Sequence, residues 1–427
     1  MKQFRILPLS GALTFSLIVA AANCAYAAAG DLDPSFGARG QVETNFGRVV
    51  IPSAAVLQPD GNIVVAAGFN ATPIAAEAMA LVRYLADGSL DTSFGNDGVS
   101  EFAAFTDFVN IPNALALQSD GKLLVAGETR NAMGGIDEFV LARFNPDGTV
   151  DRSFGNAGVV ATSFGPIRSS ADAILLQPDG QILVSGVLVL GGARTPLRTV
   201  LARYNPDGSL DTSFGDGGAV VLIAIGDANQ LALDSDGRIF AINGALFGNE
   251  RAVQFNPDGS VNSPTAVGTI IATSNGSGIQ ADTNFVVVGS QATIGRRGDF
   301  EAVVARFTPN NTPDPTFNRA VFDFGAESDT VDQARAVAIQ SNGQIIVGGG
   351  SNNGSTRFGS IFGLARLNPD GSLDGSFGNG GTVTTEFQGA DSVLAVLIQP
   401  DGNIIAVGSV RDGSGRIDIA LARYLGQ

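Results

Sequence analysis

The sequence predicts an all-β fold built from tandem repeats, and three observations carry that prediction. Two phrases, VLARYNPDGSLDTSFG at residues 200–215 and LQPDGQILVSG at residues 176–186, recur with a period of about 60 residues. The runs between the turns are short and apolar and show no helical periodicity. The two ends of the chain carry complementary parts of one repeat. Four short strands per repeat are typical of a propeller blade, so seven repeats predict a seven-bladed β-propeller over residues 28–427.

The first half of each repeat predicts a β-hairpin. Short apolar runs such as Ala114–Leu117 and Lys122–Gly127 flank a four-residue turn of the Gln-Pro-Asp-Gly type. Proline presets the φ that a type I turn needs, aspartate tolerates the next position, and glycine takes up a positive φ. The blades are expected to start near residues 53, 113, 171, 228, 278, 334 and 393, and their turns are Gln58–Gly61, Gln118–Gly121, Gln177–Gly180, Asp234–Gly237, Gln280–Thr283, Gln340–Gly343 and Gln399–Gly402.

The second half of each repeat predicts two more strands. A third strand of the Phe139–Asn145 type leads into an Asn-Pro-Asp-Gly turn, a Leu-Asp-x-Ser-Phe-Gly segment and a fourth strand such as Gly158–Phe164. The strands are mostly apolar throughout, which is expected where neighbouring blades cover both faces of a sheet. The fourth and fifth repeats depart from the pattern at Ser263–Thr265 and Ala281–Thr283. Either these repeats are worn or a partner docks there.

The ends of the chain predict how the ring closes. The chain opens with Leu32–Gly37 (LDPSFG) and a run at Gln41–Phe46 that reads as a fourth strand with no blade before it. It ends at Leu421–Tyr424, a third strand with no fourth strand after it. We therefore expect strand 41–46 to be the outer strand of blade seven, which leaves no blade short of a strand and limits exposed edges.

A charged pair recurs in the second half of the repeat. The arginine of the third strand is followed eight residues later by an aspartate, and in the fourth copy both charges are replaced together, giving Gln254 and Asn262. Because a lone charge near a core is costly while a neutral amide pair is tolerated, joint replacement predicts direct contact. Arg423 has no aspartate downstream, so its expected partner is Asp33 across the closure. The other five pairs are Arg83/Asp91, Arg143/Asp151, Arg203/Asp211, Arg306/Asp314 and Arg366/Asp374.

These repeated phrases closely resemble the repeats of the delta-60 family of exported bacterial proteins. The resemblance covers nearly all of residues 30–425, in register from unit to unit, and is weakest over residues 227–300. It implies a β-propeller fold. The family has no established reaction or ligand, so the resemblance implies no catalytic residue.

The first 27 residues predict a secretory signal peptide. Lys2 and Arg5 form its charged start, Ile6–Ala21 is apolar, and a small-x-small pattern predicts cleavage after Ala27. A lipoprotein signal ending at Cys24 is the alternative. We expect a periplasmic or secreted protein, since no other stretch is long and apolar enough to span a bilayer.

Charge and cysteine content narrow the range of partners. Loss of Lys2 and Arg5 takes the formal net charge from −16 to −18, which repels phosphate backbones, so nucleic acid is not an expected partner. Loss of Cys24, the single cysteine, means that stability comes from packing without disulfides. The expected oligomeric state is a monomer.

The sequence lacks the residues of several kinds of catalytic centre. It has no histidine, and the mature chain has no cysteine, which excludes His-dependent triads, thiol nucleophiles and the usual zinc, copper and haem ligand sets. Lys122, the one lysine of the mature chain, follows a hairpin turn and is expected to be solvated. Paired carboxylates still allow glycoside cleavage in principle. Asp234–Gly237 offers oxygen ligands, but no turn matches a full calcium loop, so we expect no cofactor, with calcium as the alternative.

The two faces of the ring are expected to differ. One carries the repeated turns, and the other carries the two-to-three and four-to-one loops, which differ in every copy. Variable loops on a rigid scaffold are where recognition is usually found. The alternative is that these loops are merely solvated. Eight arginines in these loops form a candidate binding rim on an acidic protein: Arg130, Arg194, Arg198, Arg296, Arg297, Arg357, Arg411 and Arg416.

Three functions remain open from the sequence. The first is a non-catalytic exported scaffold that binds a protein or a glycan through its variable-loop face. The second is a carboxylate- or calcium-dependent hydrolase or lactonase with a site at the central channel, and the third is a surface adhesion or array module. Asp, Glu and Asn gathered at one end of the channel would favour the enzyme, whereas a channel lined only by small apolar side chains would favour the binding module.

Overall fold

The described part of the chain consists of strands and turns. The computed structural model describes residues 27–427 apart from 71–77, 103–107, 132–136, 166–167, 192–196, 223–229, 235, 243–251, 264–272, 281–283, 293–299, 311, 326–330, 353–360 and 388. The predicted signal peptide therefore lies outside the described residues except for Ala27. No helix is found in the described ranges, so none there crosses a membrane, and the prediction of an all-β chain is confirmed.

The strands fall into antiparallel units of four that follow the order of the repeats. The first three units are β2 (Val49–Leu57), β3 (Ile63–Asn70), β4 (Ala78–Tyr84) and β5 (Val99–Phe102); β6 (Phe108–Leu117), β7 (Leu123–Asn131), β8 (Glu138–Phe144) and β9 (Val159–Thr162); and β10 (Arg168–Leu176), β11 (Ile182–Val189), β12 (Arg198–Tyr204) and β13 (Ala219–Leu222). The later units are β14 (Gln230–Leu233), β15 (Ile239–Ile242), β16 (Ala252–Phe255) and β17 (Val261–Ser263); β18 (Thr273–Ile279), β19 (Phe285–Ala292), β20 (Phe300–Phe307) and β21 (Ala320–Phe322); β22 (Val331–Ile339), β23 (Ile345–Asn352), β24 (Ile361–Leu367) and β25 (Thr382–Thr385); and β26 (Ala390–Ile398), β27 (Ile404–Arg411) and β28 (Ile417–Tyr424), joined by β1 (Gln41–Thr44).

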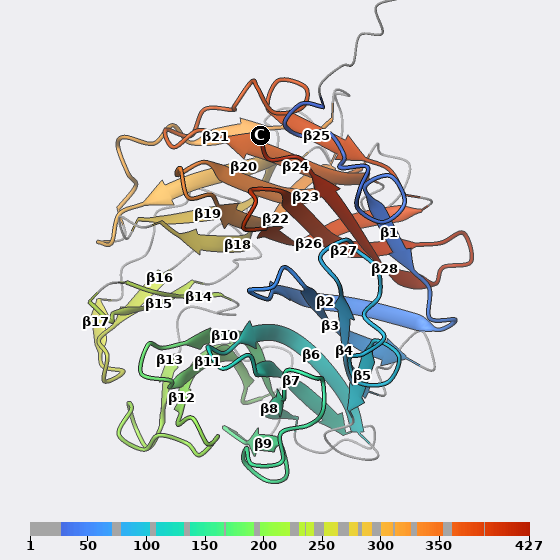
Figure 1. Ribbon diagram of the computed structural model, residues 1–427. Helices are drawn as coiled ribbons and strands as arrows, with labels where there is room; N and C mark the ends of the chain where they lie inside the picture. The colour runs from blue at the N-terminus through green and yellow to red at the C-terminus, as the bar shows by residue number, and fades with distance from the viewer. Residues whose placement is uncertain are drawn as a thin grey trace, which may run out of the picture.

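Within each unit, consecutive strands pair side by side. The units that begin with β18 and β22 are joined into one eight-stranded sheet, but a single parallel pair, Phe300 with Val331, makes that link. The other sheets have four strands each. Figure 1 shows the units arranged around a common centre, with the first strand of each on the inside. The first strands also contact one another in sequence from β2 to β26, and β26 contacts β2.

The N-terminal strand completes the last unit. β1 pairs antiparallel with β28, from Gln41 opposite Ala422 to Thr44 opposite Ile419. The segment before β1 continues the contact, because the Gly30 amide donates to the carbonyl of residue 425 at 2.8 Å. The two ends of the chain therefore lie together in one sheet.

The core lies between neighbouring sheets. Ile63, Val65 and Ala67 of β3 pack in a cluster with residues of β27 and β28, whereas Val64 and Ala66 of the same strand pack with residues of β7 and β8. Alternate side chains of a strand point to opposite faces, so β3 is buried on both sides. This explains why the strands are apolar throughout.

Some observed strands are longer than the strands predicted from the sequence, and others are shorter. β6 and β7 are longer than the predicted runs Ala114–Leu117 and Lys122–Gly127, and β9 and β1 stop short of the predicted Gly158–Phe164 and Gln41–Phe46. The inner strands are longer because they also pair in the variable regions, where no repeated phrase marks them. The turns behave as predicted: Gly61 has a φ of 86°, and its amide donates to the Gln58 carbonyl at 2.9 Å.

Candidate functional site

The repeated Arg and Asp residues lie at one end of the sheets, the turn end, which also carries turns such as Gln58–Gly61. The structure brings each of the six charged pairs together, with nitrogen–oxygen distances of 2.7 to 2.9 Å. Arg423 and Asp33, 390 residues apart in the sequence, are one of these pairs. In the fourth repeat the Asn262 amide donates to Gln254 Oε1 at 3.0 Å, in place of the charged contact.

The same arginines connect neighbouring repeats. Each guanidinium lies over a phenylalanine ring, 4.5 to 4.8 Å from its centroid. Each also donates to a backbone carbonyl in the next repeat, as Arg143 does to Pro206 at 2.6 Å. Arg423 of the last repeat donates to the Ala86 carbonyl of the first at 2.7 Å. The turn end is therefore occupied by contacts that hold sheet to sheet.

The aspartates of these pairs are held in the ionised form. Burial raises the pKa of Asp151, but hydrogen bonds from the Ser153 hydroxyl and the Lys122 ammonium, followed by the charge of Arg143, outweigh it and lower the pKa well below its usual value. The Lys122 nitrogen lies 2.9 Å from the Asp151 carboxylate, so this lysine serves the same structural contact. These carboxylates are poor candidates for general acids.

The residues weighed for calcium are also engaged by protein groups. Asp234 Oδ2 lies 2.6 Å from Arg238 Nε, and Asp234 Oδ1 accepts backbone N–H groups of Asp236 and Arg238. Residue 235 of this turn lies outside the described residues. Over the described ranges, no group of three or more His, Cys, Asp or Glu side chains is placed to hold a metal ion.

Half of the candidate rim arginines fall in the described part of the chain. Arg130, Arg198 and Arg411 lie at strand ends and not in loops, so the predicted position is wrong for these three, and Arg416 lies in a loop as predicted. Arg416 Nη2 lies 2.9 Å from an Asp412 carboxylate oxygen, and Arg411 donates to the Gly415 carbonyl at 3.0 Å. The remaining rim residues, Arg194, Arg296, Arg297 and Arg357, lie outside the described residues.

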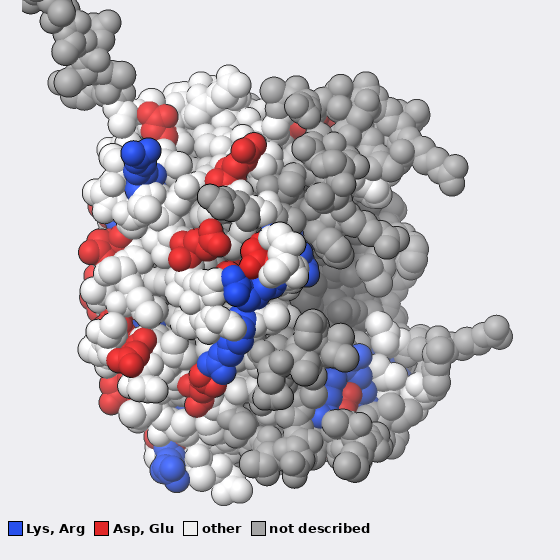
Figure 2. All heavy atoms as spheres, turned by 90° about the vertical axis from the view of Figure 1, so that its right-hand side faces the viewer, with Lys and Arg blue, Asp and Glu red and all other residues white. Residues whose placement is uncertain are grey.

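Basic side chains on the described surface lie next to acidic ones. Figure 2 shows one side of the molecule, where the largest blue group of Lys and Arg side chains touches red Asp and Glu side chains. Among the described residues on this side, the largest basic group is therefore accompanied by acidic groups. Several of these arginines, such as Arg130 and Arg416, are held in place by carboxylates.

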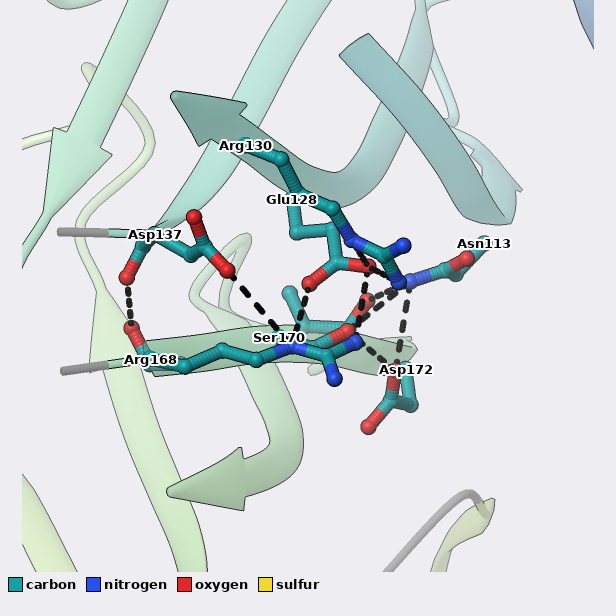
Figure 3. Close-up of polar contacts among 9 residues, drawn as sticks. Asn113, Glu128, Arg130, Asp137, Arg168, Ser170 and Asp172 are labelled. Carbon is teal, nitrogen blue, oxygen red and sulfur yellow. Dashed lines mark hydrogen bonds and ion pairs between the residues drawn. The ribbon is translucent and has the colours of Figure 1, made fainter. Parts of the chain in front are cut away.

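One such group differs from the others in the described part of the chain, because one buried carboxylate contacts two arginines. Glu128 on β7 is 2% exposed, and its carboxylate accepts hydrogen bonds from Arg130 Nε at 2.9 Å and Arg168 Nε at 3.1 Å. Arg168 is the first residue of β10, so the contact joins the second and third repeats. Asp137, next to β8, adds a second carboxylate 3.7 Å from Arg168 Nε. Figure 3 shows both arginines converging on Glu128.

This group lies at the end opposite the turn end, the loop end, where β7 finishes and β8 and β10 begin. Burial opposes the charge of Arg168, but the hydrogen bonds and charge of Glu128, with the charges of Asp137 and Asp172, raise its pKa. The side chains of Arg130 and Arg168 are 44% and 38% exposed, against 3% for that of Glu128. A buried carboxylate thus holds two guanidinium groups at the surface with donors free to meet solvent or a ligand.

A second polar contact lies beside the first on the inner strands. The Asn113 amide of β6 donates to Ser170 Oγ at 3.1 Å and to an Asp172 carboxylate oxygen at 3.2 Å, both on β10. The Ser170 hydroxyl donates to the same Asp172 oxygen at 2.7 Å. Together these residues form the loop-end cluster: Asn113, Glu128, Arg130, Asp137, Arg168, Ser170 and Asp172.

Sequence comparison among the repeats could have identified Glu128. Its strand position is set by pairing with Ile111, next to the bulge of β6. The same register places small or apolar residues in the other repeats that show this bulge: Gly68, Val187, Ser290, Gly350 and Ser409. A glutamate at a strand position that is small or apolar in the other repeats marks Glu128 as unusual. Glu128 does not recur among the repeats, so the recurring residues alone do not point to it.

One cleft on the described surface lies beside repeated turns. Its volume is about 800 Å³, and it lies between the end of β9, the segment around Ser213 and the turn at Asp258–Val261. Ser213 and Asp258 are both hydrogen-bonded in structural turns. These two polar groups of the cleft are therefore used in structural turns of the repeats.

A family model of a β-propeller domain matches five segments of the chain. The family described as "Domain of unknown function (DUF5122) beta-propeller" matches residues 58–94, 118–154, 177–214, 340–377 and 399–426. The fold is that of a β-propeller. A search of curated proteins gave no match.

A search of solved structures found chains of similar overall shape. A protein of unknown function from Dyadobacter fermentans is 11% identical with a TM-score of 0.50, over 92% of this chain and all of the other. The β-propeller domain of the Trilobed protease from Pyrococcus furiosus is 8% identical at a TM-score of 0.44, over 90% of this chain and 95% of that domain. The PQQ-bound aldose sugar dehydrogenase from Streptomyces coelicolor is 12% identical at 0.39, over 90% and 98%. The last two scores are too low to support any inference about this propeller.

Proposed function

We propose that this protein is an exported, seven-bladed β-propeller of delta-60 repeats that closes through its N-terminal strand and binds a partner without catalysis. The pairing of β1 with β28 supports closure, as does the hydrogen bond from Arg423 to the Ala86 carbonyl of the first repeat. The pattern of residues 1–27 supports export to the periplasm or beyond the cell. The proposed oligomeric state is a monomer.

The loop-end cluster is the proposed binding site. The observation that carries this proposal is the contrast between the two ends of the sheets. At the turn end, charged groups recur from repeat to repeat and are used up in contacts between sheets. At the loop end, Glu128 and its two arginines occur once and keep guanidinium donors partly exposed. A ring of equal units gains a specific site where one unit differs from the rest.

The arrangement suits a partner rich in oxygen acceptors, either a glycan or a polar protein segment. Guanidinium groups held by a buried carboxylate lose little freedom on binding, because their positions are already fixed. Exposed large apolar side chains in the described part of the chain are few: Ile51, Leu85, Leu197, Val221, Val261 and Val321, of which Val221 and Val261 line the same cleft. Of the two partner classes, this polar surface favours the glycan.

A binding assay with matched variants tests the proposal. The labelled mature protein would be screened on a glycan array and, in parallel, against envelope and culture fractions with and without chelator. Arg130→Gln removes one exposed donor while Arg168 still holds Glu128. Arg152→Gln removes an exposed arginine next to Asp151 at the turn end and is the control.

We expect Arg130→Gln to weaken binding of the identified partner by about tenfold and Arg152→Gln to leave it unchanged. Thermal unfolding of both variants would show that each is folded. Equal binding by all three proteins would contradict the site, and retention by protein fractions alone would select the protein segment over the glycan. Loss of binding on adding chelator would point to calcium.

A carboxylate-dependent hydrolase is the second candidate, because Asn113, Glu128 and Asp172 gather near the inner strands. Both carboxylate oxygens of Glu128 accept hydrogen bonds from arginines, so Asp172 is the residue to test. Activity on a panel of glycosides and lactones that falls about 100-fold in Asp172→Asn would support the enzyme. Wild-type protein without activity on the panel would contradict it.

A further inference from the structure

A row of inner-strand residues is set apart by a β-bulge. In six of the first strands the register with the second strand shifts by one residue, so that one residue has no partner in the ladder. Such bulges turn a side chain away from the regular pleat. We call these residues the bulge row: Ser53, Asn113, Asp172, Asn275, Arg335 and Leu394.

Bulge-row side chains of neighbouring repeats can reach one another. Asn113 and Asp172 do so at 3.2 Å, across β6 and β10. β22 packs closely on β18 in the same way, since a Cβ added to Gly276 would lie 2.6 Å from the Arg335 carbonyl oxygen. The residue that follows Arg335 in the row is Leu394, and the residue that precedes it is Asn275, neither of which is charged.

Arg335 is a half-buried arginine without a carboxylate. Its guanidinium makes one side-chain hydrogen bond, to Gln333 Oε1 at 2.9 Å, and no ion pair with any described residue. The arginines of the six charged pairs differ, because each contacts an aspartate, as Arg203 does. Burial lowers the pKa of the Arg335 guanidinium, with no acidic group to oppose that effect. A cation held this way costs stability, which a purely structural role does not explain.

We propose that Arg335 binds the carboxylate of a small ligand that reaches the inner strands. The planar guanidinium matches a carboxylate through two parallel hydrogen bonds, and Gln333 fixes its orientation while its other donors have no side-chain partner among the described residues. The ligand supplies the negative charge that the described residues around Arg335 lack. Arg335 lies on β22, away from β6, β7 and β10, so this site is independent of the loop-end cluster and of the scaffold proposal.

The test uses the mature full chain and three probes at matched ionic strength: sodium glucuronate, sodium citrate and sodium phosphate, with sodium chloride as the reference. Titration calorimetry gives the affinity, and thermal unfolding gives the shift in Tm. The variants are Arg335→Met, which keeps much of the side-chain volume, and Arg335→Lys, which keeps the charge but not the fork. Arg152→Gln, an exposed arginine elsewhere, is the control.

We expect a carboxylate probe to bind the wild-type protein, at least about tenfold more weakly to Arg335→Lys, and not measurably to Arg335→Met, with Arg152→Gln unchanged. Without probe, Arg335→Met should have a higher Tm than the wild type. The proposal is overturned if no carboxylate binds the wild type, if Arg335→Met binds equally, or if phosphate alone binds. A lower Tm for Arg335→Met with unchanged probe binding would show a structural arginine.

Discussion

Each motif arginine is held by three different groups. Arg203 contacts the Asp211 carboxylate at 2.7 Å, lies over an aromatic ring and donates to the Pro257 carbonyl of the next repeat. Its charge is therefore balanced inside the protein and not by water. The neutral Gln254–Asn262 pair fits the same place because its amides donate and accept without a charge to balance.

Removing one partner should cost more than replacing both. We expect Asp211→Asn to lower the free energy of unfolding by about 3 kcal/mol, because Arg203 stays buried without a carboxylate. The double variant Arg203→Gln/Asp211→Asn copies Gln254 and Asn262 and should recover a large part of that loss. Urea unfolding at pH 7 measures both. A double variant no more stable than the single one would contradict a direct coupling.

The cost of Asp211→Asn should depend on pH. The Ser213 hydroxyl, the Ser213 backbone N–H and Arg203 lower the pKa of Asp211 against the opposing effect of burial. A carboxylate with a lowered pKa in the folded state stabilises the protein above its unfolded pKa of about 3.9, and this stabilisation is lost as the pH falls toward the folded value. The difference between wild type and Asp211→Asn should therefore be constant from pH 7 to 5 and shrink below about pH 4.

Urea unfolding at each pH gives this difference directly. A difference that stays constant down to pH 3 would mean that the ionisation of Asp211 does not stabilise the fold.

The charged pairs could be deduced from the sequence because they recur. Seven copies act as an internal comparison, and the joint change to Gln254 and Asn262 identified contacting residues. Glu128 and Arg168 could not be paired in this way. They lie 40 residues apart in different repeats and occur once, so no second copy reveals that they meet. Arg335 also occurs once at its strand position, so the repeats give no second copy to compare.

The pairing of β1 with β28 is the contact on which the proposed closure depends. β28 lies between β27 and β1 in its sheet, so without β1 it would become an edge strand with unpaired backbone groups. Side chains strengthen the contact, since Arg423 Nη2 also donates to Ser35 Oγ at 2.8 Å. The segment therefore contributes main-chain and side-chain bonds to one junction.

Deleting residues 28–46 should leave this sheet incomplete. We expect a lower Tm and self-association, and a synthetic peptide of residues 28–47 should bind the truncated protein and restore the Tm. The control peptide carries Asp33→Asn, which leaves Arg423 without its carboxylate and should bind at least about tenfold more weakly. Wild-type Tm in the truncated protein, without peptide, would contradict the role given to β1.

Strand order could be predicted from the sequence more reliably than strand length. The phrases around the turns mark where strands meet, so the place of the N-terminal strand in the last unit followed from counting them. The phrases do not extend to the loop end. There β6 begins at Phe108, well before the predicted run at Ala114, because main-chain pairing with β7 continues through variable residues.

At the scale of the whole molecule, the two ends of the described part of the chain are neighbours. The Gly30 amide donates to the Leu425 carbonyl, and the Leu425 amide donates to the Asp31 carbonyl, at 2.8 and 2.9 Å. The same carbonyl-to-arginine contact that joins consecutive repeats also joins Arg423 to Ala86. In the proposed ring every unit then has a neighbour on each side, which limits exposed edges.

A circular permutant tests this arrangement. The new chain would begin at Arg48 and join Gln427 to Ala28 through a linker of about four glycine and serine residues, long enough to span ends already in contact. We expect it to fold with a Tm within a few degrees of the wild type, because each unit keeps its four strands. A second permutant opened between Asp60 and Gly61 separates β2 from β3 and should be less stable. An insoluble first permutant would contradict the adjacency of the ends.

The partnership of β1 and β28 also determines when the protein can finish folding. The residues translated first must wait for those translated last, since the final sheet lacks a strand until residue 424 has left the ribosome. Folding and synthesis are thereby separated in time. A chain of this topology stays unfinished during translation, which is compatible with the export proposed above, because an incomplete fold can still be threaded through a narrow pore.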